Sequence, residues 1–151
     1  MPRLLVVCHS PGTALPAMVE AAVAGGRSDG LEGVDVVTIA ALELTTPDVV
    51  GADGYLLVTP ANLGYMSGAL KHAFDTVYAD ALDVTRGRPF AALVHGESDT
   101  TGALRSIEMV TTGLEWRLAT PMVSIIGPVT DNDLAACREA GAVVAALTLW
   151  T

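Results

Sequence analysis

Cysteine, aromatic residues and positive charge are all scarce in this chain of 151 residues. Its two cysteines, Cys8 and Cys137, are too few for a disulfide framework or a metal cluster, so we expect no metal site and two reduced thiols. Only 8 Lys and Arg residues oppose 17 Asp and Glu residues, which gives a net charge of −9. Nucleic acids and anionic membranes need basic patches, so the charge argues against both and favours a small-molecule substrate or a basic partner.

Long apolar runs are also missing. None approaches the ~20 residues that a membrane-spanning helix needs. The run Leu4-Leu5-Val6-Val7 is too short for a signal peptide and no cleavage site follows it, so we expect a cytoplasmic protein. With 51% hydrophobic residues, the chain is long enough for one complete core, and we expect a single domain over residues 1–151. Homo-oligomerisation is compatible with the sequence.

Short apolar segments alternate with segments of helical period. We expect strands near residues 4–8, 34–39, 55–59, 90–94 and 122–126, and helices near 13–24, 66–81, 104–114 and 130–147. Such alternation predicts an α/β fold of three layers, a doubly wound parallel sheet of five strands in the order 2-1-3-4-5. Ligands bind such sheets where the winding reverses, which is between strands one and three.

The segment after the first strand, Cys8-His9-Ser10-Pro11-Gly12-Thr13, opens a helix. The hydroxyls of Ser10 and Thr13, the flexible Gly12 and the free N–H groups of a helix start are suited to a phosphate. The alternative is an ordinary connection with a Ser or Thr cap. Pro11 and Pro16 weaken the phosphate interpretation because each lacks an N–H donor.

The segment after the third strand runs from Pro60 to Gly68. Asn62 and Gly64 permit unusual backbone conformations, Tyr65 could stack on an aromatic ring, and Met66 would anchor the next helix. Peptide groups held in this way can bind the edge of a flat heterocycle. The alternative is a long connection with a buried Tyr. Together the two segments, at the expected switch point, indicate a flavin nucleotide site.

A third segment, from His95 to Gly102, follows the fourth strand and could close the site. We expect His95 to be a packed, hydrogen-bonded histidine and not a general base. Glu97 and Asp99 are interpreted as solvated acids, with Asp99 able to cap the next helix. Acids here would disfavour a phosphate but could accept hydrogen bonds from a pyrimidine N–H.

Other sites are unsupported, because the chain contains no G-x-G-x-x-G, Walker or G-x-S-x-G sequence. Cys8 ends the first strand, which is where a cysteine phosphatase carries its nucleophile. The loop of such an enzyme needs an arginine to bind phosphate, and this chain has Ala14 at that position. Residues 3–10 also lack the acids that a response regulator needs. We therefore expect Cys8 to belong to the core.

The run Pro60-Ala61-Asn62-Leu63-Gly64-Tyr65-Met66-Ser67-Gly68-Ala69-Leu70-Lys71, continued by Phe74-Asp75, resembles the flavodoxin superfamily, especially its flavodoxin-like NAD(P)H-dependent FMN reductases and quinone reductases. The resemblance implies a flavodoxin-like fold over nearly the whole chain and FMN as cofactor. By this resemblance, one side of the flavin ring would lie against Pro60, Ala61, Asn62, Leu63, Gly64, Tyr65 and Met66. The phosphate would be bound by Ser10, Gly12, Thr13, Ala14 and Leu15. The other side of the ring would lie against His95, Gly96, Glu97 and Asp99. The chain departs from the family where Ala14 and Leu15 replace hydroxyl residues and where the third loop is acidic.

The resemblance further implies an oxidoreductase that passes electrons from NAD(P)H through FMN to a quinone or flavin acceptor. Hydride transfer to a flavin needs stacking and no protein acid or base, so no catalytic residue is assigned. Two alternatives stay open: a one-electron carrier, favoured by the acidic charge, and a binding module that has lost its flavin, favoured by the altered first loop.

Overall fold

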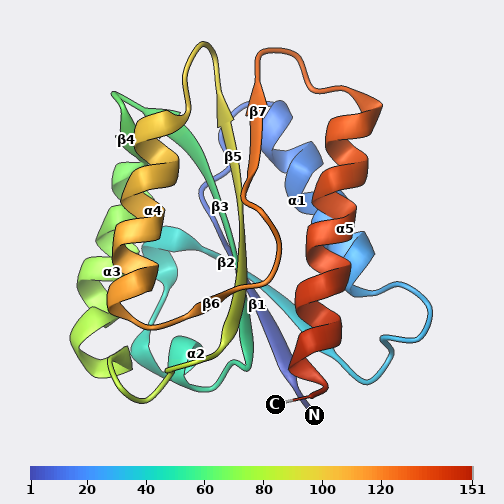
Figure 1. Cartoon of the computed structure of the whole chain (residues 1–151), viewed down its shortest axis with the longest axis vertical. Coiled ribbons are helices and arrows are strands. Elements are labelled where there is room, and N and C mark those ends of the chain that lie inside the picture. Colours follow the sequence, from blue (N-terminus) through green and yellow to red (C-terminus); the bar gives the residue numbers. More distant parts are fainter. Residues whose placement is uncertain (151) are drawn as a thin grey trace.

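A central sheet separates two layers of helices in the computed structural model, which describes residues 1–150 (Figure 1). The elements follow in the order β1 (Arg3–Cys8), α1 (Ala14–Gly26), β2 (Asp35–Ala40), the 3-10 helix η1 (Ala41–Glu43), α2 (Thr46–Val50), β3 (Gly54–Asn62), β4 (Tyr65–Met66), α3 (Gly68–Ala81), β5 (Pro89–Gly96), α4 (Thr101–Gly113), β6 (Arg117–Leu118), β7 (Val123–Ile126) and α5 (Asp131–Thr148). All five predicted strands and all four predicted helices are present near their expected positions.

The strand order is β2-β1-β3-β5, and β6 and β7 both pair with the outer side of β5. These strands are parallel, so the predicted order 2-1-3-4-5 is confirmed, with two short strands sharing the fifth position. The additional strand β4 is antiparallel to the end of β3. The sequence did not indicate β4 or β6, because two residues are too few to show an alternating pattern.

Side chains of the sheet alternate between two separate core clusters. Leu4 and Val6 pack with α1 and α5, whereas Leu5 and Val7 pack with α3 and α4. Figure 1 shows the same division, with α1 and α5 on one side of the sheet and α3 and α4 on the other. This double coverage explains why the strands are continuous apolar runs. Among residues 1–150, no helix combines the length and the apolar character that crossing a bilayer requires.

The close packing of α1 on α5 corrects one expectation. The sequence predicted a helix that ends near residue 24, but α1 continues through Gly26. A Cβ atom on Gly25 would overlap the carbonyl of Arg138, and one on Gly141 would overlap that of Ala22. The two glycines therefore let the helix backbones touch, so the helical contact overrides their preference for turns.

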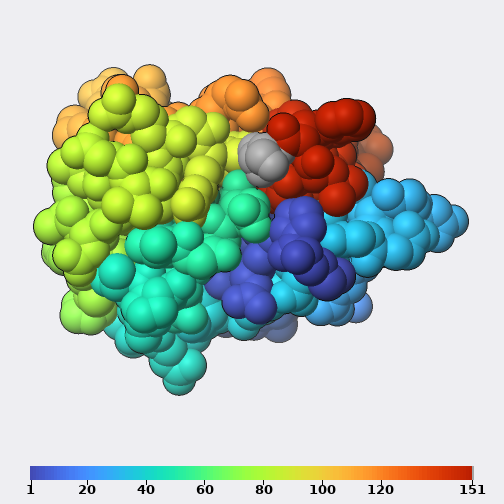
Figure 2. All heavy atoms as spheres, turned by 90° about the horizontal axis from the view of Figure 1, so that it is seen from below, coloured from blue at the N-terminus to red at the C-terminus, as the bar shows by residue number. Residues whose placement is uncertain are grey.

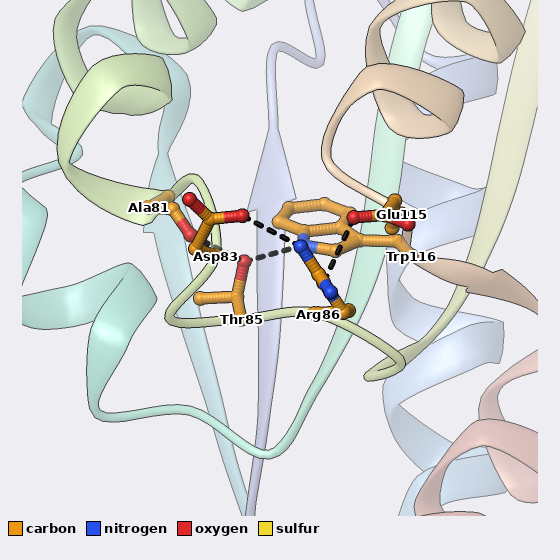
Figure 3. A network of polar contacts seen from close by, with 6 residues as sticks. All are labelled: Ala81, Asp83, Thr85, Arg86, Glu115 and Trp116. Carbon is orange, nitrogen blue, oxygen red and sulfur yellow. Dashed lines mark hydrogen bonds and ion pairs between the residues drawn. The ribbon is translucent and has the colours of Figure 1, made fainter.

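The amino ends of the strands form the lower end of the molecule in Figure 1, where α5 also ends. Figure 2, which views this end, shows the first residues beside the last turn of α5. At the start of β3, Trp116 stacks on Tyr55 with ring centroids 3.9 Å apart. The indole N–H of Trp116 donates to Thr85 Oγ1 at 2.7 Å (Figure 3). Phe74 and Phe90 also lie beside the Trp116 ring, so this aromatic cluster lies away from the expected site.

Candidate functional site

Two adjoining cavities lie at the carboxyl ends of the central strands. One, of about 480 Å³, lies between the start of α1 and the segments after β5 and β7, and is lined by Thr13, Ala14, Ala17, His95, Glu97, Gly127, Pro128, Val129 and Leu134. The other, of about 370 Å³, extends toward the end of β3 and is lined by Pro11, Gly12, Thr13, Ala14, Leu15, Pro60, His95 and Glu97. Both volumes fall within the usual range of ligand pockets. Four residues line both cavities, so we treat them as one pocket.

The start of α1 supplies backbone donors to this pocket. Gly12 has a φ of +77° and turns the chain into the helix, which begins at Ala14. The N–H groups of Ala14 and Leu15 have no acceptor within residues 1–150, as is usual for the first turn of a helix. The exposed hydroxyl of Thr13 makes no capping bond. These groups form a cradle that fits an anion, although Pro11 and Pro16 contribute no donor.

Ser10 precedes this cradle in the chain and lines neither cavity. Burial raises the pKa of the Cys8 thiol, and a hydrogen bond with Ser10 acts in the opposite direction. The thiol also lies 3.7 Å from the carbonyl oxygen of Ile39. Cys8 is therefore a half-buried, protonated residue at the end of β1, which agrees with the expected core role.

His95 connects two of the segments around the pocket. It is only 9% exposed, and its Nε2 lies 2.7 Å from the carbonyl oxygen of Gly127. Because a carbonyl only accepts, Nε2 carries the proton. As expected, His95 is packed and hydrogen-bonded, and it fixes the segment after β7 against the end of β5.

The acids of the third segment have different environments. Asp99 accepts a hydrogen bond from the Thr101 N–H at 2.9 Å, and this bond lowers the pKa of its carboxyl. Asp99 thus binds the first N–H of α4 from the position before the N-cap residue Thr100, whose own side chain makes no capping bond. Glu97 is exposed and lines both cavities, and within residues 1–150 its carboxylate has no hydrogen-bond or ion-pair partner.

The segment from Pro60 to Met66 differs from the expected loop. Its first residues prolong β3, and Tyr65–Met66 forms β4, so the segment is an antiparallel hairpin with Leu63 and Gly64 at its turn. Both turn residues have positive φ, 50° and 74°. Met66 is buried and donates its N–H to Ser106 Oγ at 3.1 Å, so the hairpin is fastened to α4. We expected Met66 to anchor the next helix, α3; the structure places its side chain in the core cluster that α3 and α4 share, whereas its N–H bonds α4.

The structure gathers only part of the predicted set around the pocket. Seven predicted residues line it: Gly12, Thr13, Ala14, Leu15, Pro60, His95 and Glu97. The others lie at its margin or on the hairpin and do not line either cavity: Ser10, Ala61, Asn62, Leu63, Gly64, Tyr65, Met66, Gly96 and Asp99. Their contacts with a flavin stay predictions.

Sequence reasoning missed the segment after β7. Gly127, Pro128 and Val129 form one wall of the larger cavity, together with Ala17 of α1 and Leu134 of α5. The available signal was the Gly127-Pro128 pair directly after the fifth predicted strand, at the same edge of the sheet as the other segments.

Comparison with known proteins defines the class. The model of the NADPH-dependent FMN reductase family matches residues 37–125, more than half of the chain. The chain therefore belongs to this family of flavodoxin-like, FMN-binding oxidoreductases. The match includes the hairpin and the third segment but not the cradle at the start of α1.

One relative and two solved structures are similar to this chain. A flavodoxin of Aquifex aeolicus (strain VF5) is 35% identical over 80 residues, which cover 53% of this chain and 42% of the relative, so the match spans less than half of that protein. An archaeal flavodoxin superposes with a TM-score of 0.81 at 22% identity, covering 99% of both chains. A flavodoxin, WrbA-like protein from Agrobacterium tumefaciens gives 0.78 at 17% identity, again over 99% of both. At these identities the structures show a shared fold.

Proposed function

We propose that this protein binds FMN in the pocket at the start of α1 and uses it to transfer electrons from NADH or NADPH to a quinone or flavin acceptor. Two observations support the proposal together, the family match and the composition of the pocket. The family match supports FMN, and the pocket combines unpaired backbone donors with apolar walls at the carboxyl ends of β1, β3, β5 and β7.

The chain offers distinct groups to the parts of FMN. Ser10, Gly12, Thr13 and the N–H groups of Ala14 and Leu15 would hold the phosphate. Pro60 and His95 would border the ring, with the hairpin turn and the segment after β7 beside them. FMN itself supplies the hydride chemistry when bound, so the protein's tasks are to orient it and to exclude water.

An open ring face favours a nicotinamide-using enzyme. Among residues 1–150, no Phe, Tyr or Trp lines either cavity. Trp116 and Tyr55 are stacked on each other at the other end of the sheet, and Tyr65 is 40% exposed on the hairpin. Without an aromatic cover, a nicotinamide or a quinone has room to stack on the flavin.

Steady-state oxidation of NADH and NADPH tests the proposal. FMN is added to the purified protein, excess flavin is removed, and nucleotide oxidation is followed with a quinone or free flavin as acceptor. We expect turnover above that of free FMN at the same concentration. Added salt should raise the rate or leave it unchanged, because screening reduces repulsion between an anionic nucleotide and a protein of charge −9. Turnover no faster than free FMN would reject the enzyme.

A one-electron carrier is the second candidate. The relative from Aquifex aeolicus is named a flavodoxin, and a charge of −9 suits docking to a basic partner. A flavin-loaded protein that exchanges single electrons with a basic redox protein, but oxidises neither nucleotide, would support the carrier. A protein that takes up no flavin would instead support a binding module.

A further inference from the structure

Glu97 is the charged group that lines the pocket. It borders both cavities together with Thr13 and Ala14, the residues at the start of α1. Among the described residues, no Lys or Arg lines either cavity, and the Glu97 carboxylate has no partner to neutralise it. The cradle for an anion therefore shares its pocket with a free negative charge.

Two other acids, Asp99 and Asp133, accept hydrogen bonds from backbone N–H groups at the starts of helices. Asp99 accepts the Thr101 N–H at the start of α4, and Asp133 accepts the Thr130 N–H at 2.9 Å in the capping box of α5. Neither lines the cavities. Their charge is partly balanced by the helix N-termini beside them, which leaves Glu97 as the carboxylate that a ligand in the pocket would meet.

The cradle has few groups to offset that charge. Pro11 and Pro16 supply no N–H, and the side chains of Ala14 and Leu15 supply no hydroxyl. Leu15 is instead buried in the core beneath α1. The remaining donors are backbone N–H groups, including those of Ala14 and Leu15, and the hydroxyls of Ser10 and Thr13.

We infer that Glu97 determines which flavin the site accepts, by opposing the terminal phosphate of FMN. A phosphate monoester carries about −1.5 to −2 charges at pH 7, whereas riboflavin carries none. Repulsion by Glu97 offsets the gain from the cradle, so the site distinguishes FMN only weakly from riboflavin and takes the dephosphorylated flavin as a second ligand. This inference rests on the proposed flavin site.

Binding of the two flavins to Glu97→Gln tests the inference. Dissociation constants for FMN and riboflavin are measured by quenching of flavin fluorescence in the wild type, in Glu97→Gln and in Glu108→Gln. Glu108 is an exposed acid on α4 that lines neither part of the pocket, so its variant makes the same change in net charge at a remote position.

We expect Glu97→Gln to bind FMN about 3- to 30-fold more tightly, as screened repulsion over several ångströms allows, and riboflavin within about twofold of the wild type. Glu108→Gln should change neither constant by more than about twofold, since surface charges at that range are screened. In the wild type, raising the salt from about 0.01 M to about 0.15 M should strengthen FMN binding and not riboflavin binding, and in Glu97→Gln this dependence should be smaller.

Equal effects on both flavins, or no effect, would overturn the role of Glu97 while leaving the flavin site intact. If Glu97→Gln binds FMN and the wild type does not, the inference is supported in its strongest form. If no variant binds either flavin, this inference fails together with the proposed function.

Discussion

The backbone of Gly102, in the first turn of α4, lies directly against the carbonyl group of Gly64 in the β3–β4 turn. A Cβ atom at Gly102 would overlap that carbonyl, so the contact requires glycine. With the bond from the Met66 N–H to Ser106, it holds the hairpin on α4 at two points. The hairpin is thereby positioned by a helix about 40 residues further along the chain.

Gly102→Ala should therefore destabilise the protein by roughly 1–3 kcal/mol, the usual cost of overpacking a rigid contact. Urea unfolding followed by circular dichroism measures the change. Gly68→Ala is the matched control, because Gly68 has open space around its Cβ position and begins α3. It should be neutral or stabilising by up to about 1 kcal/mol, since alanine favours helix. Similar losses in both variants would contradict the role given to the contact.

Replacing the hydroxyl of Thr13 in the cradle and that of Ser10 beside it should separate phosphate binding from ring binding. Ser10→Ala combined with Thr13→Ala should weaken FMN by about 1.5–3 kcal/mol for each charged hydrogen bond lost, and riboflavin hardly at all. Fluorescence titration with both flavins checks this. Equal weakening of the two ligands would assign these residues to the ring or to loop structure.

The sequence predicted the strands that are covered by helices on both faces, because burial on two sides leaves a visible apolar run. It could not predict the hairpin, because β4 has only two residues and the bond that fastens it joins Met66 to Ser106, 40 positions further along the chain. The wall formed by Gly127, Pro128 and Val129 depends on tertiary contacts as well, including the bond from His95. Local patterns identified the edge of the sheet that carries the pocket, but only packing decides which side chains face it.

The buried bond between Trp116 and Thr85 gives a further prediction. Thr85→Val keeps the shape of the side chain but leaves the indole N–H of Trp116 without its acceptor, and it also removes the bond from Thr85 to the Ala81 carbonyl. We expect a loss of about 1–3 kcal/mol in the free energy of unfolding, the cost of a buried unsatisfied donor. In a Trp116→Phe background, the same substitution should cost less, because phenylalanine has no N–H. An equal cost in both backgrounds would show that the bond contributes nothing.

The thiol of Cys137 should make the protein sensitive to alkaline pH. Cys137 lies fully buried between α5 and the sheet, and burial, aided by the negative charge of Asp133, raises its pKa to about 11. In the unfolded chain a thiol titrates near pH ~8.5, so the folded state disfavours the thiolate. Its contribution to stability is fully present below that value and is lost as pH rises toward 11.

Comparison with Cys137→Ala isolates this effect, because the titrations of tyrosines, lysines and Cys8 are common to both proteins and cancel in the difference. Between about pH 7.5 and about pH 10, the wild type should lose roughly 1–2 kcal/mol more free energy of unfolding than the variant, as linkage requires for a pKa raised by this amount. Urea unfolding at the two pH values, under reducing conditions, measures both changes. A difference between the proteins that stays constant with pH would mean that Cys137 ionises as readily in the folded state as in the unfolded one.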